Sequence, residues 1–357
     1  MSSTVPVVAV TGFLGAGKTT LVNHLLRHPT ARVGVIVNDF GDINIDAGLV
    51  IGQVDEPVSI AGGCVCCLPD AGGLGAALQK LTNPKLDLDV ILVEASGIAD
   101  PVSLSRLIRS SGVERVRPGG VIDVVDALEY FHTVDTRPLV PNRFAAATLV
   151  VLNKTDRLNP QAREYTLARI AQRVHERNPH AHLVRARHGR IDPALVFDSA
   201  VREEPADELP IRSLLLEMHA EHDTGGHQHA EAVSAQSSGA IDAGRLLDLL
   251  ENPPNGVYRI KGEVFVDSGH AIRSYLVNLV GRSIHIRARP ASARSGLNST
   301  SSGRRLADHS SNQLVAVGVH IDVSTTRARL QRALAPAEGP AAADGLRRLQ
   351  RYRRLST

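Results

Sequence analysis

The sequence contains no tryptophan, only two methionines and 3% aromatic residues among 357. Hydrophobic residues still make up 43% of the chain, so it can bury a sizeable core, and that core must be mostly aliphatic. No apolar run approaches the roughly 18 residues of a membrane-spanning helix. The first ten residues lack a charged n-region, so we expect no signal peptide. The length suits about two domains.

An excess of one charge is also missing, since 40 Lys and Arg face 37 Asp and Glu, a net charge of +3. Nucleic-acid binding needs a concentrated basic face, which this balance does not indicate. Cysteine is scarce too, and Cys64, Cys66 and Cys67 fall within four positions. An odd number packed so closely excludes a disulfide framework and suits a reducing compartment. We therefore expect a cytoplasmic protein with no nucleic-acid or membrane partner.

Short runs rich in Val and Ile alternate with helical patterns along the first half of the chain. Because these runs are almost continuously apolar, they indicate strands buried on both faces of a parallel sheet. The expected strands are 6–11, 33–38, 88–94, 120–125, 148–153 and 182–185. The expected helices are 19–27, 76–81, 102–110 and 161–177. This alternation predicts an α/β domain with a doubly wound, mostly parallel sheet.

The second half begins with a polar, His-containing stretch, 221–239, that is typical of an exposed connector. The elements expected after it are strand 257–266, helix 271–280, strands 282–287 and 313–320, and helix 325–334. The order β-α-β-β-α predicts a smaller, ferredoxin-like α+β domain. The expected division is a first domain at 1–213, a flexible linker at 214–254, a second domain at 255–336 and a basic tail at 337–357. The five arginines of that tail indicate either a charged helix or contact with an acidic partner.

Residues 12–19, GFLGAGKT, match the phosphate loop GxxxxGK[ST] between an expected strand and an expected helix. Glycine lets backbone N–H groups curl around phosphates, and the start of the helix adds its positive dipole end. Lys18 would reach the β- and γ-phosphates, and the Thr19 hydroxyl would coordinate Mg²⁺. The nucleotide-binding residues expected here are Gly12, Gly15, Ala16, Gly17, Lys18, Thr19 and Thr20. The motif predicts a P-loop nucleotide-binding domain.

Asn153, Lys154 and Asp156 form an NKxD pattern at the end of a later expected strand. The Asp156 carboxylate can accept hydrogen bonds from N1–H and the 2-amino group of guanine, whereas adenine offers neither donor. This pattern predicts GTP rather than ATP and counts against a P-loop kinase. Residues 187–189, after the next expected strand, could close over the base.

The three cysteines lie in GGCVCCLP, residues 62–69, where flanking Gly and Pro predict a turn. Thiolates are soft ligands that favour Zn²⁺, Cu(I) and iron–sulfur chemistry. Three cysteines this close rarely complete a tetrahedron, so we expect a fourth ligand or an open position. Inert buried residues, or a redox pair of Cys64 and Cys67, are the alternatives.

With GGCVCC placed between the phosphate loop and NKTD, the sequence resembles the CobW-type GTPases, the metallochaperone family of the SIMIBI class of P-loop proteins. The resemblance extends from about Val5 to Leu334. Supporting stretches are NDFGD at 38–42, EASGIADP at 94–101 and VDA at 125–127. The C-terminal part resembles the CobW C-terminal domain, which implies a variable half that faces partners or metal.

By this resemblance, Glu94 would hold the Mg²⁺ shell and the Gly97 N–H would sense the γ-phosphate. Asp39 and Asp42, where the family commonly has Glu, would add oxygen ligands beside the thiolates. The resemblance implies hydrolysis of GTP to GDP and phosphate, which switches the cysteine site between holding and releasing a metal. No residue that positions water, and no arginine finger, is evident in the motifs. We therefore expect slow turnover that depends on a partner, a metal or a second copy in a homodimer.

The leading hypothesis is a GTPase that carries zinc to a client metalloprotein. One alternative keeps the activity and changes the cargo to Co²⁺, Ni²⁺ or iron, and another is a GTP-gated scaffold with structural cysteines. His222, His227 and His229 of the expected linker could collect metal loosely, although a solvated linker explains them equally well.

Overall fold

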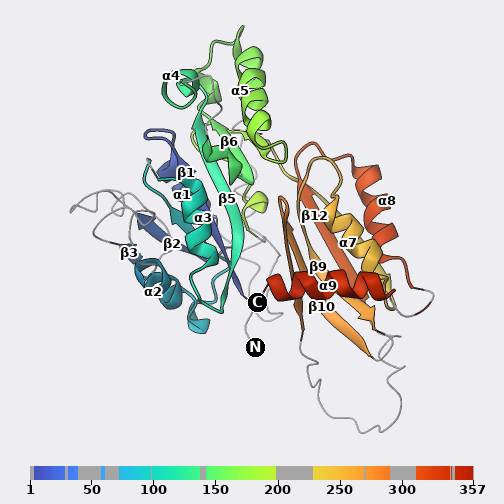
Figure 1. Cartoon of the computed structure of the whole chain (residues 1–357). Helices are drawn as coiled ribbons and strands as arrows, with labels where there is room; N and C mark the ends of the chain where they lie inside the picture. The colour runs from blue at the N-terminus through green and yellow to red at the C-terminus, as the bar shows by residue number, and fades with distance from the viewer. Residues whose placement is uncertain are drawn as a thin grey trace, which may run out of the picture. The chain divides into compact units, whose positions relative to one another are not determined.

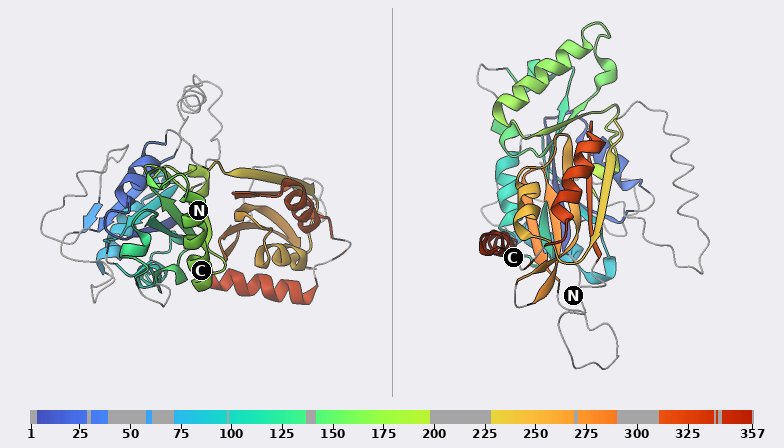
Figure 2. Two further views of the ribbon diagram at one scale, coloured as in Figure 1. Left: turned by 90° about the horizontal axis from the view of Figure 1, so that it is seen from above. Right: turned by 90° about the vertical axis from the view of Figure 1, so that its right-hand side faces the viewer.

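The computed structural model describes residues 4–28, 31–38, 58–60, 72–97, 99–136, 142–197, 228–268, 271–289, 311–337, 339 and 342–356. The chain forms two compact units, Met1–His229 and Ala230–Thr357. Figure 1 labels most helices and strands of both units, and Figure 2 shows them from two further directions.

A seven-stranded sheet forms the centre of the first unit, in the order β3-β2-β4-β1-β5-β6-β7 (Figure 1). Its strands are β1 (Val5–Gly12), β2 (Val33–Asn38), β3 (Val58–Ile60), β4 (Val90–Glu94), β5 (Val116–Asp126), β6 (Leu149–Asn153) and β7 (His182–Arg185). Every neighbouring pair is parallel. The predicted doubly wound parallel sheet is therefore confirmed. Strand β3 is too short to give a sequence pattern, and the prediction missed it.

The longer helices of this unit bury aliphatic residues against the sheet. They are α1 (Lys18–Leu26), α2 (Gly72–Leu81), α3 (Pro101–Arg109), α4 (Tyr130–Thr133) and α5 (Arg163–Arg177), with short 3-10 turns η3 (Pro84–Leu86), η4 (Asn142–Ala145), η5 (Thr155–Arg157) and η6 (Pro193–Leu195). Leucines of α2 and α3 pack with residues of β1 and β4, and α5 packs with β5 and β6. Helix α3 begins where Pro101 follows the N-cap Asp100, whose carboxylate accepts from two backbone N–H groups.

The parallel arrangement brings the carboxyl ends of the strands to one edge of the sheet. In the strand register, Glu94 at the end of β4 lies beside Val10 of β1, and Asp126 at the end of β5 lies beside Asn153 at the end of β6. The phosphate loop starts at the end of β1 on the same edge. The fold therefore gathers the motifs that lie far apart in the sequence.

A five-stranded antiparallel sheet, in the order β11-β10-β9-β12-β8, forms the second unit. Its strands are β8 (Glu231–Ser238), β9 (Val257–Asp267), β10 (Ile272–Val280), β11 (Ser283–Ala288) and β12 (Ser311–Gly318), and its helices are α7 (Ala243–Glu251), α8 (Val323–Leu334) and α9 (Ala343–Leu355). Leucines of all three helices share one core with alternate strand residues such as Ile260, Val277 and Leu314. The helices therefore cover one face of this sheet, and the predicted smaller α+β domain is confirmed.

The helix expected over 271–280 is wrong, because this segment is strand β10. Its apolar residues repeat at helical spacing, but Tyr275, Val277 and Leu279 also alternate, and these three face the core. The segment forms a strand rather than a helix because it pairs with β9 along one edge and with β11 along the other. Tertiary pairing of this kind is not visible in one short segment.

The expected linker 214–254 is wrong from residue 231 onward, where β8 and α7 lie. Strand β8 has small and polar residues, and only Val233 and Ala235 are buried, so it gives a weak pattern. Helix α7 begins at the N-cap Asp242, whose carboxylate accepts from Arg245 N–H. The tail forms α9, whose Leu349 is buried in the core of the second unit. Among the described residues, no helix is long and apolar enough to cross a membrane.

Candidate nucleotide and metal site

The phosphate loop joins β1 to α1 through glycines with positive φ. Gly12 has φ 152° and Gly17 has φ 103°. A Cβ atom at Gly12 would lie 2.5 Å from the Val124 carbonyl oxygen, and one at Gly17 would lie 2.4 Å from Nδ2 of Asn153. Larger residues at both positions would therefore clash as well as strain the backbone.

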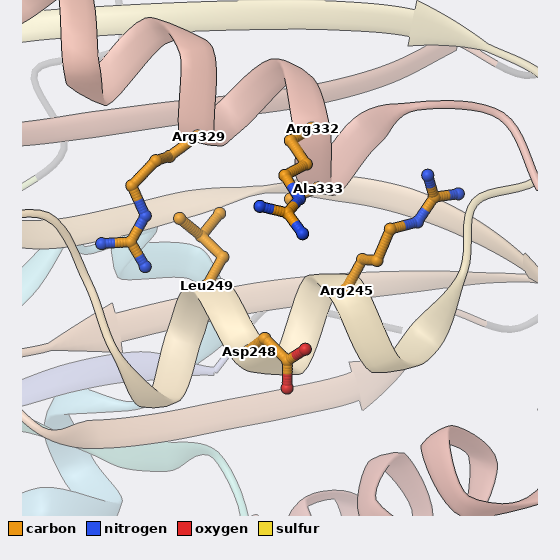
Figure 3. A pocket seen from close by; sticks show the side chains of 6 residues that line it. All are labelled: Arg245, Asp248, Leu249, Arg329, Arg332 and Ala333. Atoms are coloured by element: carbon orange, nitrogen blue, oxygen red, sulfur yellow. The ribbon is translucent and has the colours of Figure 1, made fainter.

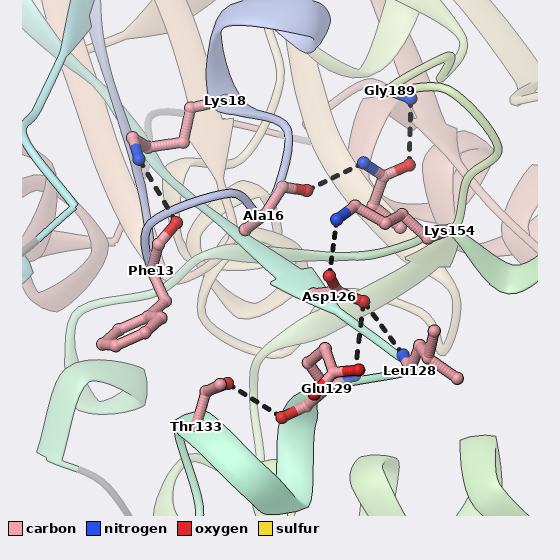
Figure 4. Close-up of polar contacts among 10 residues, drawn as sticks. Phe13, Ala16, Lys18, Asp126, Leu128, Glu129, Thr133, Lys154 and Gly189 are labelled. Carbon is pink, nitrogen blue, oxygen red and sulfur yellow. Dashed lines mark hydrogen bonds and ion pairs between the residues drawn. The ribbon is translucent and has the colours of Figure 1, made fainter. Parts of the chain in front are cut away.

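Helix α1 begins at the end of this loop, and Gly17 is its N-cap residue. Glycine has no side chain that could accept hydrogen bonds from the N–H groups of the first turn. The helix dipole favours an anion at this end of α1. Lys18 is only 9% exposed, and its Nζ donates to the carbonyl oxygen of Phe13 at 3.3 Å (Figure 4). The loop therefore combines a buried cation with uncapped backbone donors, as a phosphate group requires. Gly15, Ala16 and Thr20 complete the predicted loop, and Gly15 and Thr20 are exposed.

Thr19 and Glu94 bring two oxygen-bearing side chains together beside the loop. The Thr19 hydroxyl donates to Oε1 of Glu94 at 2.7 Å, and Glu94 is 2% exposed at the end of β4. Oxygen donors of this kind suit Mg²⁺, so the residues fit the ion that a bound nucleotide would bring. Gly97 lies against the loop, since a Cβ there would be 2.8 Å from the Leu14 nitrogen.

Asp100 ends the segment between β4 and α3 and is the N-cap residue of α3. Desolvation opposes ionisation of this carboxyl group, but hydrogen bonds from Ser103 and Val102 outweigh it and hold the pKa of Asp100 below its ordinary value. The carboxylate is therefore charged at neutral pH and fixes the start of α3.

Asn153 links the phosphate loop to the segment after β7. Its Nδ2 donates to the Ala16 carbonyl oxygen at 2.8 Å, and its Oδ1 accepts from Gly189 N–H at 2.9 Å (Figure 4). Gly189 has φ 67°, and a Cβ there would lie 2.7 Å from the Leu21 nitrogen of α1. The buried Asn153 amide therefore connects three segments: the phosphate loop, the end of β6 and the segment after β7.

Lys154 and Asp156 follow Asn153 directly after the end of β6. Lys154 Nζ donates to Oδ2 of Asp126 at 2.6 Å, while Oδ1 of Asp126 accepts from Leu128 N–H at 3.0 Å. The side chain of Asp156 is 30% exposed, and its Oδ2 lies 3.9 Å from Nε2 of His188. An accessible carboxylate next to an anchored lysine stem can accept two donors from a purine edge.

The structure thus brings the predicted phosphate, Mg²⁺ and base residues to one edge of the sheet. The predicted metal ligands Asp39, Asp42, Cys64, Cys66 and Cys67 lie outside the described residues, as do His222 and His227. The neighbouring strands are described, and Asn38 of β2 is the register partner of Ile60 of β3. Strands β2 and β3, which precede the two segments with the predicted ligands, therefore both end at the edge that carries the phosphate loop. Among the described residues, no three His, Cys, Asp or Glu side chains gather to hold a metal ion, and His229 is exposed.

Sequence reasoning missed three buried contacts of this region. It gave no partner for Lys154, although Asp126 lies in the noted stretch 125–127. It also missed Asp123, which accepts from the Thr11 hydroxyl at 2.7 Å and from two nitrogens of Arg143 at 2.7 and 2.8 Å. An Asp in the middle of an apolar strand is the one available signal, because buried carboxylates need partners.

Comparison with known proteins follows the same division of the chain. The pattern described as "CobW/HypB/UreG, nucleotide-binding domain" matches residues 6–185, and "Cobalamin synthesis protein cobW C-terminal domain" matches residues 230–334. Together these two matches cover most of both units.

Individual relatives agree with these matches. The chain is 31% identical to zinc chaperone YjiA of Escherichia coli (strain K12) over 55% of this chain and 61% of that protein. It is 27% identical to zinc chaperone CobW of Sinorhizobium sp over 78% and 86% of the two chains. The crystal structure of zinc-bound YjiA GTPase from E. coli is 19% identical, with a TM-score of 0.40 over 93% of this chain and 99% of that one. The chain belongs to the CobW/HypB/UreG family of P-loop proteins and carries the CobW C-terminal domain.

Proposed function

We propose that this protein binds and hydrolyses GTP, and that its nucleotide state controls the holding and release of zinc for a client metalloprotein. The observation that carries the GTP part is the Asn153 amide, which ties the phosphate loop at Ala16 to the NKTD turn and to Gly189. Phosphate and base recognition therefore form one rigid unit.

Each residue of this unit has a proposed task. Uncapped N–H groups of α1 and the Lys18 ammonium bind the phosphates, and Asp156 selects guanine. The Thr19 hydroxyl and Glu94 hold Mg²⁺, which when bound neutralises charge on the phosphates. Gly97, in contact with Leu14, moves with the phosphate loop and reports the γ-phosphate to the segment after β4.

The zinc part of the proposal rests on chemistry and on position in the chain. Three thiolates are soft ligands that favour zinc among the common divalent ions of the cell. Cys64 follows the end of β3 by four residues, and Asp39 follows the end of β2 directly. Both relatives named above are called zinc chaperones. Co²⁺, Ni²⁺ or iron as cargo, or cysteines with a purely structural role, are the outcomes that metal measurements would have to exclude.

Base selection offers the sharpest test of the GTP part. We expect the wild-type protein to bind a fluorescent GTP analogue at least about 100-fold more tightly than the ATP analogue, because adenine leaves the Asp156 carboxylate unpaired. Asp156→Asn should move the preference to the xanthosine nucleotide, whose base accepts where guanine donates.

Asp87→Asn is the matched control, since Asp87 is exposed and precedes β4, away from the carboxyl edge. It should leave all three affinities unchanged. If Asp156→Asn still preferred GTP to both other nucleotides, the assignment of the base site would be wrong.

A further inference from the structure

The two units carry opposite net charge. Residues 1–229 contain 22 Lys and Arg against 27 Asp and Glu, a net charge of −5, whereas residues 230–357 contain 18 against 10, a net charge of +8. The mild total of +3 conceals this division. A unit with so strong an excess attracts acidic surfaces over several ångströms of solvent.

The helical layer of the second unit carries much of this positive charge. Its arginines are Arg245 on α7, Arg327, Arg329 and Arg332 on α8, and Arg347, Arg348, Arg351, Arg353 and Arg354 on α9. Acidic residues inside these helices are fewer. Arg348 pairs with Asp248 at 2.9 Å and Glu251 at 2.7 Å, and Arg347 lies 3.5 Å from Asp344. The layer therefore keeps a positive excess after its own ion pairs are counted.

A groove of about 270 Å³ lies between α7 and α8 (Figure 3). Its lining residues are Arg245, Asp248, Leu249, Arg329, Arg332 and Ala333. They stand at positions i, i+3 and i+4 on each helix, so one face of α7 meets one face of α8. Leu249 and Ala333 are 3% and 2% exposed, which gives the groove an apolar floor.

Two of the three arginines in this groove are held by the ends of the opposite helix. Arg245 donates to the Ala335 carbonyl oxygen at 2.8 Å, after α8, and Arg329 donates to the Asn252 carbonyl oxygen, after α7. Within the described residues, no hydrogen bond or ion pair engages the Arg332 side chain, which is exposed. The groove thus presents two fixed guanidinium groups and one that is available to a ligand.

Asp248 offsets only one of these three positive charges, and it also pairs with Arg348 of α9, so the lining keeps a positive excess. Three guanidinium groups on one small surface repel one another, and an anion placed among them relieves the repulsion. Guanidinium forks pair with carboxylates through two parallel hydrogen bonds, which fixes the orientation of a ligand as well as its charge.

We propose that this α7–α8 groove binds an acidic segment of a partner protein, with carboxylates on Arg332 and its neighbours and an aliphatic side chain over Leu249 and Ala333. A protein segment suits the layer better than nucleic acid does. Tyr352, the one aromatic residue of these three helices, bonds its hydroxyl to Glu251, so it offers no free stacking platform. Val323 and Leu355 of the same layer are 43% and 69% exposed, which adds apolar contacts at the margin.

A pair of charge reversals on one helix tests the groove directly. The probe is a short fluorescein-labelled peptide of Glu and Leu, titrated into the full chain by fluorescence anisotropy without nucleotide or zinc. Arg332→Glu should weaken binding at least about tenfold. Arg327→Glu makes the same change of charge on α8 outside the groove, and it should weaken binding less than about twofold.

Several outcomes would overturn the proposal. Equal losses in the two variants would mean diffuse attraction to a basic unit, and no loss in either would mean that the groove binds nothing acidic. Binding of a DNA duplex or of anionic vesicles that depends on Arg332, with no peptide binding, would assign the surface to another class of partner. Arg332→Gln, with thermal unfolding of each variant, separates lost binding from lost folding. Because no nucleotide is present, the result is independent of the GTP proposal.

Discussion

Charge is used differently in the two units. In the first unit, the Asp123 side chain is fully buried and its partner Arg143 is 15% exposed, with the Thr11 hydroxyl completing the cluster. In the second unit, Arg348 is 28% exposed and its partner Asp248 is 68% exposed. A buried pair fixes the position of segments, whereas an exposed pair leaves charge for a partner. We therefore expect changes at this buried pair of the first unit to affect folding, and changes at the exposed arginines of the second unit to affect association.

Removing the buried charge at Asp123 should have the largest effect on stability. Asp123→Asn leaves Arg143 buried with a neutral partner, and we expect the first unit to lose about 3–5 kcal/mol of unfolding free energy. Denaturant unfolding measures this loss. Asp248→Asn in the second unit should cost less than about 1 kcal/mol. Similar losses in the two variants would contradict the contrast between buried and exposed charge.

Lys18→Ala should separate binding from folding within the first unit. In the proposed function the ammonium donates charge-assisted hydrogen bonds to the phosphates, so we expect GTP affinity to fall about 100-fold, or ~2.7 kcal/mol, with little change in unfolding. Calorimetric titration of nucleotide measures the affinity. Lys85→Ala, on the exposed η3 turn, is the control. An affinity within about threefold of wild type would remove Lys18 from the site.

His182 should make the first unit sensitive to acid. Burial, together with smaller electrostatic contributions from His175 and His180, lowers the pKa of His182 from 6.5 to about 4. Below pH 6.5 the unfolded chain binds a proton that the folded chain refuses, so stability falls as the pH drops from 6.5 towards 4. We expect a loss of about 1–3 kcal/mol across this window.

Replacing His182 by Leu should remove most of this loss, because no proton can then bind to the unfolded chain at that position. His180→Gln, an exposed change two residues away, should leave most of it in place, because burial is the largest cause of the lowered pKa. Unfolding free energies at several pH values compare the variants. An unchanged acid response in His182→Leu would place the sensitive group elsewhere.

A pair of glycine substitutions sharpens the contrast between site and scaffold. Gly97→Ala would place its Cβ within 2.7–3.0 Å of Leu14 atoms, so we expect GTP hydrolysis to slow about tenfold. Gly75→Ala, in α2, places its Cβ 3.5 Å from the Ser111 oxygen, an ordinary contact. It should leave the rate unchanged and stabilise the helix slightly. Equal rates in the two variants would show that the Gly97 contact does not matter.

Much of the first unit could be predicted because its signals are local. Buried parallel strands read as apolar runs, and the phosphate loop and NKTD each fit within eight residues. The second unit was harder, because β10 satisfies two periodicities and β8 exposes most of its side chains. The strand with which β8 pairs, β12, is far away in the chain, so a local pattern does not predict that pairing.

The site shows the same division between local and distant signals. Lys18, Thr19 and Asp156 follow from their motifs. The two hydrogen bonds of the Asn153 amide, one to Ala16 and one from Gly189, instead depend on three segments meeting in the fold. Likewise, the groove arginines Arg245 and Arg332 are 87 positions apart in the sequence. Their common groove exists only because α7 and α8 lie side by side.

The central claim is that nucleotide state controls metal binding. The most direct measurement is zinc affinity by competition with a chromogenic chelator, with Mg²⁺ and either GDP or a non-hydrolysable GTP analogue. We predict at least a tenfold difference between the two nucleotide states, about 1.4 kcal/mol of coupling, which disappears when Cys64, Cys66 and Cys67 are changed to Ser. Equal zinc affinities in the two states would contradict the account and leave the cysteines with a structural or redox role.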